Sequence, residues 1–263
     1  MLQTDADNMT GARTKPDFLI IGAQKAGTTS LYRYLISNPR VLPAKDKQLH
    51  YFDFNFDKPV EWYEAKFPDK EGRHGVVTGE ATPYYLFHPD AAARAAHLFP
   101  DCKLIALLRD PVDRACSHYF HELKNGTEPL SFEEALAAEE ERLRGEEEKI
   151  MRAVNLYSFN HVKYSYLARG RYAEQVEKWL ARFPRERFLF VQSERLFTNP
   201  EAVMDRVFEF LGVPPYGPID FKVHNKNPIA KKEIAEDTKA RLRAYFEPYN
   251  RKLFDMIGEE FDW

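Results

Sequence analysis

The feature that most constrains the fold is a stretch near the start of the chain, residues 17–35, which reads DFLIIGAQKAGTTSLYRYL. Its continuous apolar run, Phe18 to Ile21, is typical of a strand buried on both faces, and the apolar residues after Ser30 recur at helical spacing. Two intervening glycines permit a tight turn. Amides at the start of such a helix bind anions, and Lys25 adds positive charge. The stretch therefore predicts a phosphate-binding loop.

The position of the lysine distinguishes this loop from that of nucleoside-triphosphate-binding proteins. Their motif, Gly-x-x-x-x-Gly-Lys-[Ser/Thr], has lysine directly after the second glycine, whereas Lys25 comes two residues before Gly27. GAQKAGTTSL instead resembles the 5′-phosphosulfate loop of sulfotransferases that use 3′-phosphoadenosine 5′-phosphosulfate (PAPS), most closely the heparan sulfate N- and 3-O-sulfotransferase type and its bacterial relatives. This resemblance, which covers about residues 17–263, implies that the donor is held by Lys25, Ala26, Gly27, Thr28, Thr29 and Ser30. The alternative is an ordinary strand-to-helix turn.

Composition limits the architecture and the partners. A chain of 263 residues that is 44% hydrophobic can form one α/β domain, which we expect over residues 16–263, with residues 1–15 as a disordered polar leader. A net charge of -3 gives no general attraction to nucleic acid or anionic membrane. Cys102 and Cys116 form neither a disulfide framework nor a metal-ligand spacing, and no apolar run approaches the roughly 20 residues that span a bilayer. We therefore expect a soluble, cytoplasmic protein.

A second phosphate-suited loop follows another buried strand. Leu104 to Leu108 is apolar, Arg109 comes at the end of this run, and Pro111 marks a helix start. Arg109 is suited to clamp a phosphate, and Ser117 follows about two helical turns later. The segment LRDPVDRACSHY resembles the 3′-phosphate-binding signature of the same family, which implies that Arg109 and Ser117 bind the 3′-phosphate of the donor.

The segment KDKQLHYFD, residues 45–53, is a candidate for acceptor activation. Its alternation would place Gln48 and His50 on one face if the segment were extended. Where this sequence has Gln48, the family typically has a glutamate that is the usual candidate for the base. A glutamine can orient an acceptor hydroxyl but cannot take its proton. Three explanations stay open: His50 is the base, the reaction needs little base assistance, or Gln48 is a deliberate Glu→Gln change.

The segment VVTGEATPYYL, residues 76–86, contains a further candidate, Glu80. The valines predict a short strand, and residues 79–85 a loop leaving its carboxyl end, where open α/β sheets bind ligands. Glu80 is interpreted either as an acid that contacts a basic residue or the acceptor, or as a structural ion-pair partner. Ala81 stands where the vertebrate heparan sulfate enzymes of the resembled family carry lysine, so their acceptor chemistry cannot simply be transferred.

The remaining segments have smaller roles in the prediction. The charged stretch 139–148 predicts a solvated helix without catalytic function, and residues 159–172 are interpreted either as an acceptor-side wall or as a packed segment. Residues 187–191 predict a third core strand, followed by helices over 200–211, 234–245 and 249–257. The resemblance also implies that a basic loop near residues 223–228 closes over the nucleotide, which makes Lys226 a candidate ligand.

Together these patterns predict an α/β fold with a P-loop-NTPase-like parallel sheet flanked by helices. The expected reaction is transfer of a sulfuryl group from PAPS to a hydroxyl or amine of a carbohydrate or small molecule, releasing 3′-phosphoadenosine 5′-phosphate (PAP), with Lys25, His50, Gln48 and Glu80 as catalytic candidates. We expect no metal, because Lys25 and Arg109 supply the positive charge. The competing hypotheses are a P-loop kinase or ATPase and a nucleotide-binding protein without catalysis.

Overall fold

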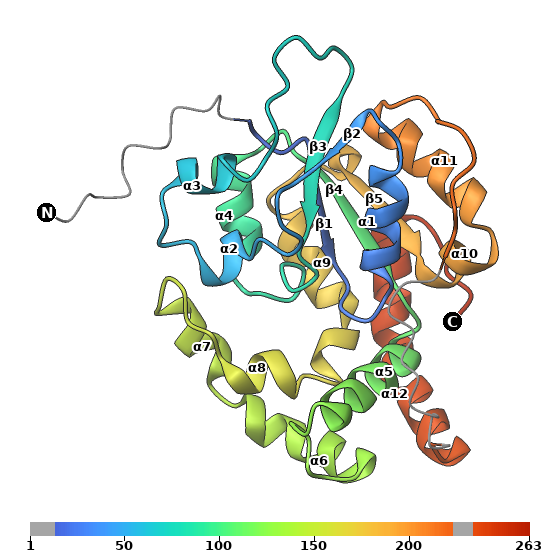
Figure 1. The fold of residues 1–263 in the computed structure, drawn as a ribbon. Coiled ribbons are helices and arrows are strands. Elements are labelled where there is room, and N and C mark those ends of the chain that lie inside the picture. Colours follow the sequence, from blue (N-terminus) through green and yellow to red (C-terminus); the bar gives the residue numbers. More distant parts are fainter. Residues whose placement is uncertain (1–13, 223–233) are drawn as a thin grey trace, which may run out of the picture.

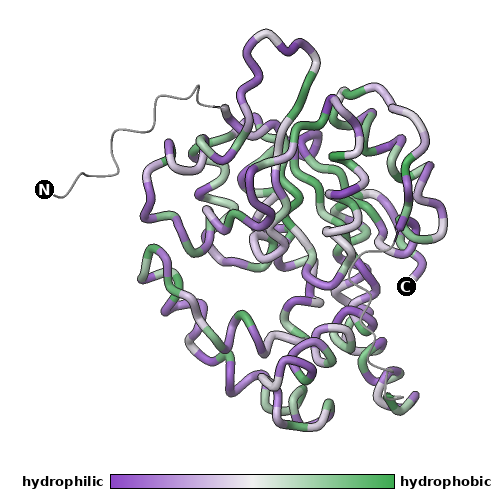
Figure 2. Tube along the Cα trace, in the orientation of Figure 1, coloured by the Kyte–Doolittle hydropathy of each residue, from purple (hydrophilic) through white to green (hydrophobic). Residues whose placement is uncertain are grey.

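The computed structural model describes residues 14–222 and 234–263. Five strands form one parallel sheet in the order β2-β3-β1-β4-β5. Their bounds are β1 Phe18–Gly22, β2 Val41–Pro43, β3 Val77–Ala81, β4 Lys103–Leu108 and β5 Phe188–Gln192. Figure 2 shows these central strands among the most hydrophobic parts of the chain. The predicted α/β fold with a parallel sheet is confirmed.

Helices cover both faces of the sheet (Figure 1). On one side α1 (Thr28–Ile36) contacts α11 (Pro200–Leu211), and on the other α9 (Tyr172–Leu180) contacts both α4 (Ala91–Leu98) and α12 (Glu236–Ile257). This arrangement follows from the strand order, because right-handed crossovers from β1 to β2 and from β3 to β4 run in opposite directions. The reversal leaves a crevice at the carboxyl ends of β1 and β4, which is where open α/β sheets bind ligands.

The remaining helices, several of them short, include the two that start directly after β4 and β5 at this carboxyl edge (Figure 1). Their bounds are α2 Tyr51–Phe54, α3 Val60–Glu64, α5 Pro111–Lys124, α6 Phe132–Leu143, α7 Glu146–Met151, α8 Phe159–Lys163 and α10 Ser193–Thr198, with 3-10 turns at Ala168–Gly170 and Arg185–Arg187. The start of α5 is capped by Asp110, whose side chain accepts from the amide of Asp113 at 2.8 Å, with Pro111 in the first turn. Helix α6 begins with the predicted capping box of Ser131 and Glu134.

Several expected boundaries were wrong. Strand β3 continues to Ala81, so Glu80 lies in the sheet and not in the loop after it. Strand β2 was not predicted, because its three residues at the edge of the sheet end in proline. The last two predicted helices are a single helix, α12, that continues through Pro248.

The charged stretch 139–148 is also less solvated than predicted. It contains the end of α6 and the start of α7, and Glu139 and Glu146 are buried. The Glu139 carboxylate accepts the backbone amides of Leu167 and Ala168 at 2.6 and 2.8 Å. These contacts tie α6 to the segment before α9, a structural role that the run of charges concealed.

Candidate active site

The loop between β1 and α1 is held in place by its neighbours. The amide of Ala23 donates to the carbonyl of Leu107 in β4 at 2.7 Å, and the Ser193 hydroxyl donates to the carbonyl of Ala26 at 2.6 Å. Gly27 precedes α1 with φ 98°, and a Cβ atom there would lie 2.7 Å from the ring of Phe197. Both conditions require glycine. The loop is therefore fixed before any ligand binds.

The start of α1 is suited to an anion. Its first turn contains no acidic residue, and no side chain caps it. Thr28 and Ser30 are buried, and the Ser30 side chain contacts Tyr34, which places the Ser30 hydroxyl away from the loop surface. Lys47 donates a hydrogen bond from Nζ to the Thr29 hydroxyl. Sequence reasoning missed Lys47, whose only signal was its place next to Gln48.

Lys25 lies among several charged groups. Burial lowers the pKa of its ammonium, the Glu122 carboxylate opposes this, and the guanidinium groups of Arg109 and Arg114 lower the pKa further. A surplus of cations around a half-buried lysine is unfavourable without an anion, so the site favours binding of one.

The second predicted loop lies beside the first. Arg109, directly after β4, donates from Nη1 to the carbonyl of Lys25 at 3.3 Å and from Nη2 to Asp113 at 2.9 Å. Its own carbonyl accepts from the hydroxyl of Tyr172 at 3.0 Å. Ser117 is half-buried on α5, which starts at the same turn. The structure thus joins the two motifs that the sequence placed about 80 residues apart.

His50 is paired with a buried carboxylate. Its Nδ1 lies 2.7 Å from Oδ2 of Asp53, and its ring stacks on Phe54 with centroids 5.1 Å apart. Burial lowers the pKa of His50, but the hydrogen bond and charge of Asp53 outweigh burial, so the pKa is raised. With Nδ1 donating to the carboxylate, Nε2 is the nitrogen that can accept a proton.

Glu80 acts as a buried anchor for the His50 segment. Its carboxylate accepts hydrogen bonds from the amide of Leu49 at 3.2 Å and from the hydroxyls of Tyr63, Thr82 and Tyr85 at 3.1, 2.5 and 2.7 Å. Burial raises the pKa of Glu80 despite these bonds, which lower it. With four neutral donors and 1% exposure, Glu80 is held by hydrogen bonds and not, within the described residues, by the ion pair of the structural interpretation. It does not face an acceptor.

The segment around Gln48 is not extended as expected. Gln48 and His50 have φ values of 61° and 50°, and the buried Leu49 lies between them. Together with Lys25 at φ 71°, these are the non-glycine residues with positive φ in the described part of the chain. All three belong to the predicted site, and such backbone strain is typical of functional positions. Gln48 is exposed in this segment, between Lys47 and the buried Leu49.

A buried acid was missed by the sequence reasoning. Glu122 on α5 is 1% exposed, and neither carboxylate oxygen makes a hydrogen bond within the described residues. Its nearest basic groups are Nζ of Lys163 at 3.4 Å and Nε2 of His118 at 3.8 Å. Burial lowers the pKa of His118 well below its usual value, which keeps the ring neutral. Glu122 is also near enough to Lys25 to raise the pKa of that lysine.

The predicted acceptor-side wall is partly a packed core. His161 is buried, stacks on Phe87 with centroids 4.2 Å apart, and shares a 2.7 Å hydrogen bond with the hydroxyl of Tyr84. Arg169 is also buried and donates to the carbonyl of His161 at 3.0 Å and to the side chain of Gln24 in the first loop. These residues connect the wall to the donor loop but do not themselves face solvent.

The remaining predictions concern Lys226, a metal ion, a membrane span and the cysteines. Lys226 lies outside the described residues. Within residues 14–222 and 234–263, no group of three or more His, Cys, Asp or Glu side chains is placed to hold a metal ion, and no helix there is long and apolar enough to cross a membrane. Both cysteines are buried, and neither forms a disulfide.

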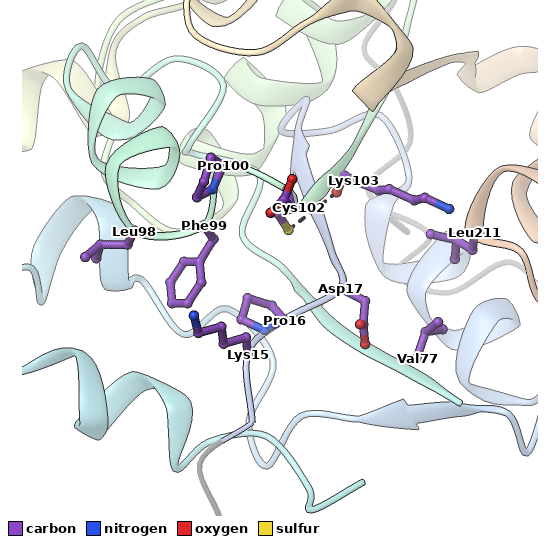
Figure 3. Close-up of a pocket in the computed structure, with 11 residues that line it drawn as sticks. Lys15, Pro16, Asp17, Val77, Leu98, Phe99, Pro100, Cys102, Lys103 and Leu211 are labelled. Atoms are coloured by element: carbon purple, nitrogen blue, oxygen red, sulfur yellow. Dashed lines mark hydrogen bonds between the residues drawn. The ribbon is translucent and has the colours of Figure 1, made fainter. Parts of the chain in front are cut away.

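A separate pocket opens at the opposite edge of the sheet (Figure 3). Its lining includes the residues that begin or precede β1, β3 and β4, among them Asp17, Val77 and Lys103. Asp17 is already engaged by Lys70 at 2.8 Å and by the amide of Thr78 at 2.7 Å. We assign this pocket no part in the site, because the two anion-suited loops lie at the carboxyl edge.

Comparison with known proteins decides the family. The model of a family described as Sulfotransferase domain matches residues 15–247. The chain belongs to the sulfotransferase domain family. The human heparan sulfate glucosamine 3-O-sulfotransferase 3B1 is 31% identical over 275 residues, which cover 96% of this chain and 66% of the relative. The mouse heparan sulfate glucosamine 3-O-sulfotransferase 6 is 32% identical over 281 residues, covering 96% of this chain and 75% of the relative.

A solved structure extends the comparison to the fold. The sulfotransferase from Alicyclobacillus acidocaldarius superposes with a TM-score of 0.77 at 32% identity, covering 94% of this chain and 98% of that one. The chain is thus similar to a bacterial sulfotransferase over nearly its whole length, whereas it spans less than two thirds of the human 3B1 enzyme. The family resemblance stated from the two motifs is confirmed.

Proposed function

We propose that this sulfotransferase-family protein transfers a sulfuryl group from PAPS to a hydroxyl or amine of a carbohydrate or small-molecule acceptor and releases PAP. One observation carries the proposal: the loops after β1 and β4 meet, with Nη1 of Arg109 3.3 Å from the carbonyl of Lys25, at a helix start that has no acidic residue. Two adjacent anion sites fit a donor with phosphate groups at both its 5′ and 3′ positions.

The two loops divide the binding of the donor. The amides of residues 26–29 and Lys25 would hold the 5′-phosphate and the sulfuryl oxygens, while Arg109 and Ser117 would hold the 3′-phosphate. Lys25 and Arg109 supply the positive charge in this scheme. Because the loops are fixed by bonds to β4 and α10, the donor is positioned with little reorganisation of the protein.

The transfer step then depends on His50 and Lys25. The acceptor oxygen forms a bond to sulfur as the bond between sulfur and the 5′-phosphate oxygen breaks. The acceptor proton passes to Nε2 of His50, whose Nδ1 is bonded to Asp53. Lys25 stabilises the charge that develops on the leaving phosphate oxygen. Glu80 acts through the Leu49 amide, and Gln48 is placed to orient an acceptor without taking its proton.

The class of acceptor has weaker support. The curated relatives named above are heparan sulfate enzymes, which favours a carbohydrate, but their names do not decide the acceptor of a chain that covers 66% of one of them. The proposed location is the cytoplasm, in keeping with two cysteines that form no disulfide.

The test is PAP release from PAPS by the purified protein over a panel of acceptors. We expect His50→Ala to lower kcat by about 10²–10⁴-fold, the usual contribution of a general base, while PAP binding stays unchanged in calorimetry. An unaltered kcat would exclude His50 as the base. Gln48→Glu separates the remaining explanations, because a rise of at least about tenfold would identify Gln48 as an inactivating change.

The exposed amide of Gln48 supports a second candidate, a PAP-binding protein without catalysis. It predicts tight PAP binding with no transfer to any acceptor, before and after Gln48→Glu. The intact His50–Asp53 pair, at 2.7 Å, favours the enzyme.

A further inference from the structure

One surface segment beside the candidate site is unusually apolar. Between α7 and α8, the exposed large hydrophobic residues within nine consecutive positions are Met151, Val154, Leu156, Tyr157 and Phe159. Elsewhere in the described chain such residues are scattered singly, at Leu123, Phe197, Tyr216 and Tyr245. Isolated exposed apolar residues are ordinary, but a cluster marks a place where something apolar binds. We call residues 151–159 the apolar lip.

Aromatic contacts connect the apolar lip to the proposed base. The ring of Tyr157, 47% exposed as a residue, lies 5.0 Å from the ring of Phe54. Phe54 stacks on His50 at 5.1 Å and on Tyr84 at 5.2 Å. An acceptor lying along the lip would therefore have its hydroxyl next to His50 and its apolar body on aromatic rings, which suits a hydrophobic ligand.

Charge argues against a polyanion at the same place. The lip contains a single charged residue, Arg152, and α7 immediately before it contributes Glu147 and Glu148 to the surface together with one lysine, Lys149, which is paired with Glu146 at 2.6 Å. Lys163, the basic residue at the end of α8, is engaged by the buried Glu122 at 3.4 Å. Ala81, which stands where the vertebrate heparan sulfate enzymes carry lysine, is buried and supplies no positive charge. A sulfated polysaccharide requires several free lysines or arginines, which the lip does not supply.

We propose that the apolar lip binds the apolar body of the acceptor, so that the substrate class is a hydroxyl carried on an aromatic ring or an alkyl chain and not a sulfated polysaccharide. This inference rests on the proposed function and specifies the acceptor of the same site. The aromatic and the alkyl acceptor have the same chemistry: an uncharged apolar body that carries one hydroxyl at its end.

The test measures PAP release by the full chain with PAPS and three acceptors: 2-naphthol, 1-decanol and an N-sulfated heparosan oligosaccharide. We expect transfer to at least one of the first two, with kcat/KM at least tenfold above that for the oligosaccharide. An aromatic acceptor is indicated if 2-naphthol leads, and an alkyl acceptor if 1-decanol leads. Preference for the oligosaccharide would overturn the proposal.

Variants locate the effect on the lip. Tyr157→Ser and Leu156→Ser should each raise KM for the preferred apolar acceptor about five- to tenfold, with PAP affinity unchanged in calorimetry. Tyr216→Ser, which changes a still more exposed tyrosine after α11, should change neither. Unchanged KM in both lip variants would overturn the proposal. So would a lip-dependent dimer in light scattering, or lip-dependent cosedimentation with phosphatidylcholine vesicles, since another occupant would then cover the lip. If the unmodified protein did not bind PAP at all, that result would instead contradict the proposed function.

Discussion

The donor side and the acceptor side of this site are built differently. The donor side consists of two loops that directly follow buried strands, are bonded to the sheet and α10, and concentrate positive charge around Lys25 and Arg109. The acceptor side is assembled from residues 47–54, 80–87 and 151–163, which meet through side-chain packing. Under the proposed function, donor binding would be fixed by the sheet, while acceptor choice could change without altering it.

Lys25→Met tests the donor side and should give the largest effect of the donor-side variants. Removing one preorganised positive group aimed at developing charge typically costs about 10²–10³ in kcat. We expect this loss in PAP release assays with only a modest change in acceptor KM. Lys252→Met, which removes an exposed lysine of α12, is the matched control. A Lys25 variant with normal kcat would show that the loop is not where charge develops.

Arg109→Ala should weaken PAP binding with smaller consequences for the acceptor. Hydrogen bonds to charged groups contribute about 1.5–3 kcal/mol, or roughly 10- to 100-fold in Kd. Calorimetry should show this loss for PAP and little change for a 5′-phosphate nucleotide that lacks the 3′-phosphate. Equal losses of affinity for both nucleotides would mean that Arg109 stabilises the loop and does not bind the 3′-phosphate, since its Nη1 also donates to the carbonyl of Lys25.

Glu80→Gln tests whether the acceptor side depends on one buried acid. The variant leaves the four donors around position 80 imperfectly paired, which should lower the free energy of unfolding by about 1–3 kcal/mol. Chemical denaturation measures this change, with the exposed Glu71→Gln as control. We also expect reduced kcat with intact PAP binding, because the Leu49 amide loses its anchor. If PAP binding fell equally, the two sides would not be separable.

The pH dependence of transfer tests whether His50 is the group that takes the acceptor proton. Because the Asp53 carboxylate outweighs burial and raises the pKa of His50, activity should fall as pH falls through this raised value and His50 becomes protonated. Asp53→Asn removes the charge, so the midpoint of this limb in a kcat/KM profile should move to lower pH. A midpoint that stayed in place would exclude His50 as the titrating group.

Removing single charges near Lys25 should have a smaller effect, a shift in the pH–rate profile. Glu122 opposes the lowering of the Lys25 pKa by burial, whereas Lys124 adds to it. Glu122→Gln should therefore shift the alkaline limb of the pH–rate profile to lower pH, and Lys124→Met should shift it to higher pH. Shifts in the same direction would show that these residues act through structure and not through charge.

The strand, turn and helix of the two loops could be predicted from the sequence because their determinants are local. Strand, glycine turn and helix start are consecutive in both motifs, so Lys25 and Arg109 could be placed from their distance to the strand ends. The acceptor side depends on contacts between distant segments. Glu80 was assigned to a loop because β3 extends past its valines, and Gln48 and His50 are not on an extended strand, because their positive φ values bend the segment around Leu49.

Burial of charged residues was the other feature that local patterns could not reveal. Glu139 lies in a run of glutamates that reads as solvated, yet it accepts two backbone amides of the segment before α9. Glu122 reads as one polar position of an amphipathic helix, although packing of α8 against α5 places it beside Lys163. Such residues are identified by their partners, and those partners lie 28 to 41 residues further along the chain.

The most direct test of the account is calorimetric titration of the protein with PAP and, separately, with ADP, each with and without magnesium. The account predicts that PAP binds at least tenfold more tightly, about 1.4 kcal/mol, without magnesium, and that Arg109→Ala removes this preference. Equal or tighter binding of ADP with magnesium would contradict the assignment of the two loops and indicate an ordinary nucleotide-binding site.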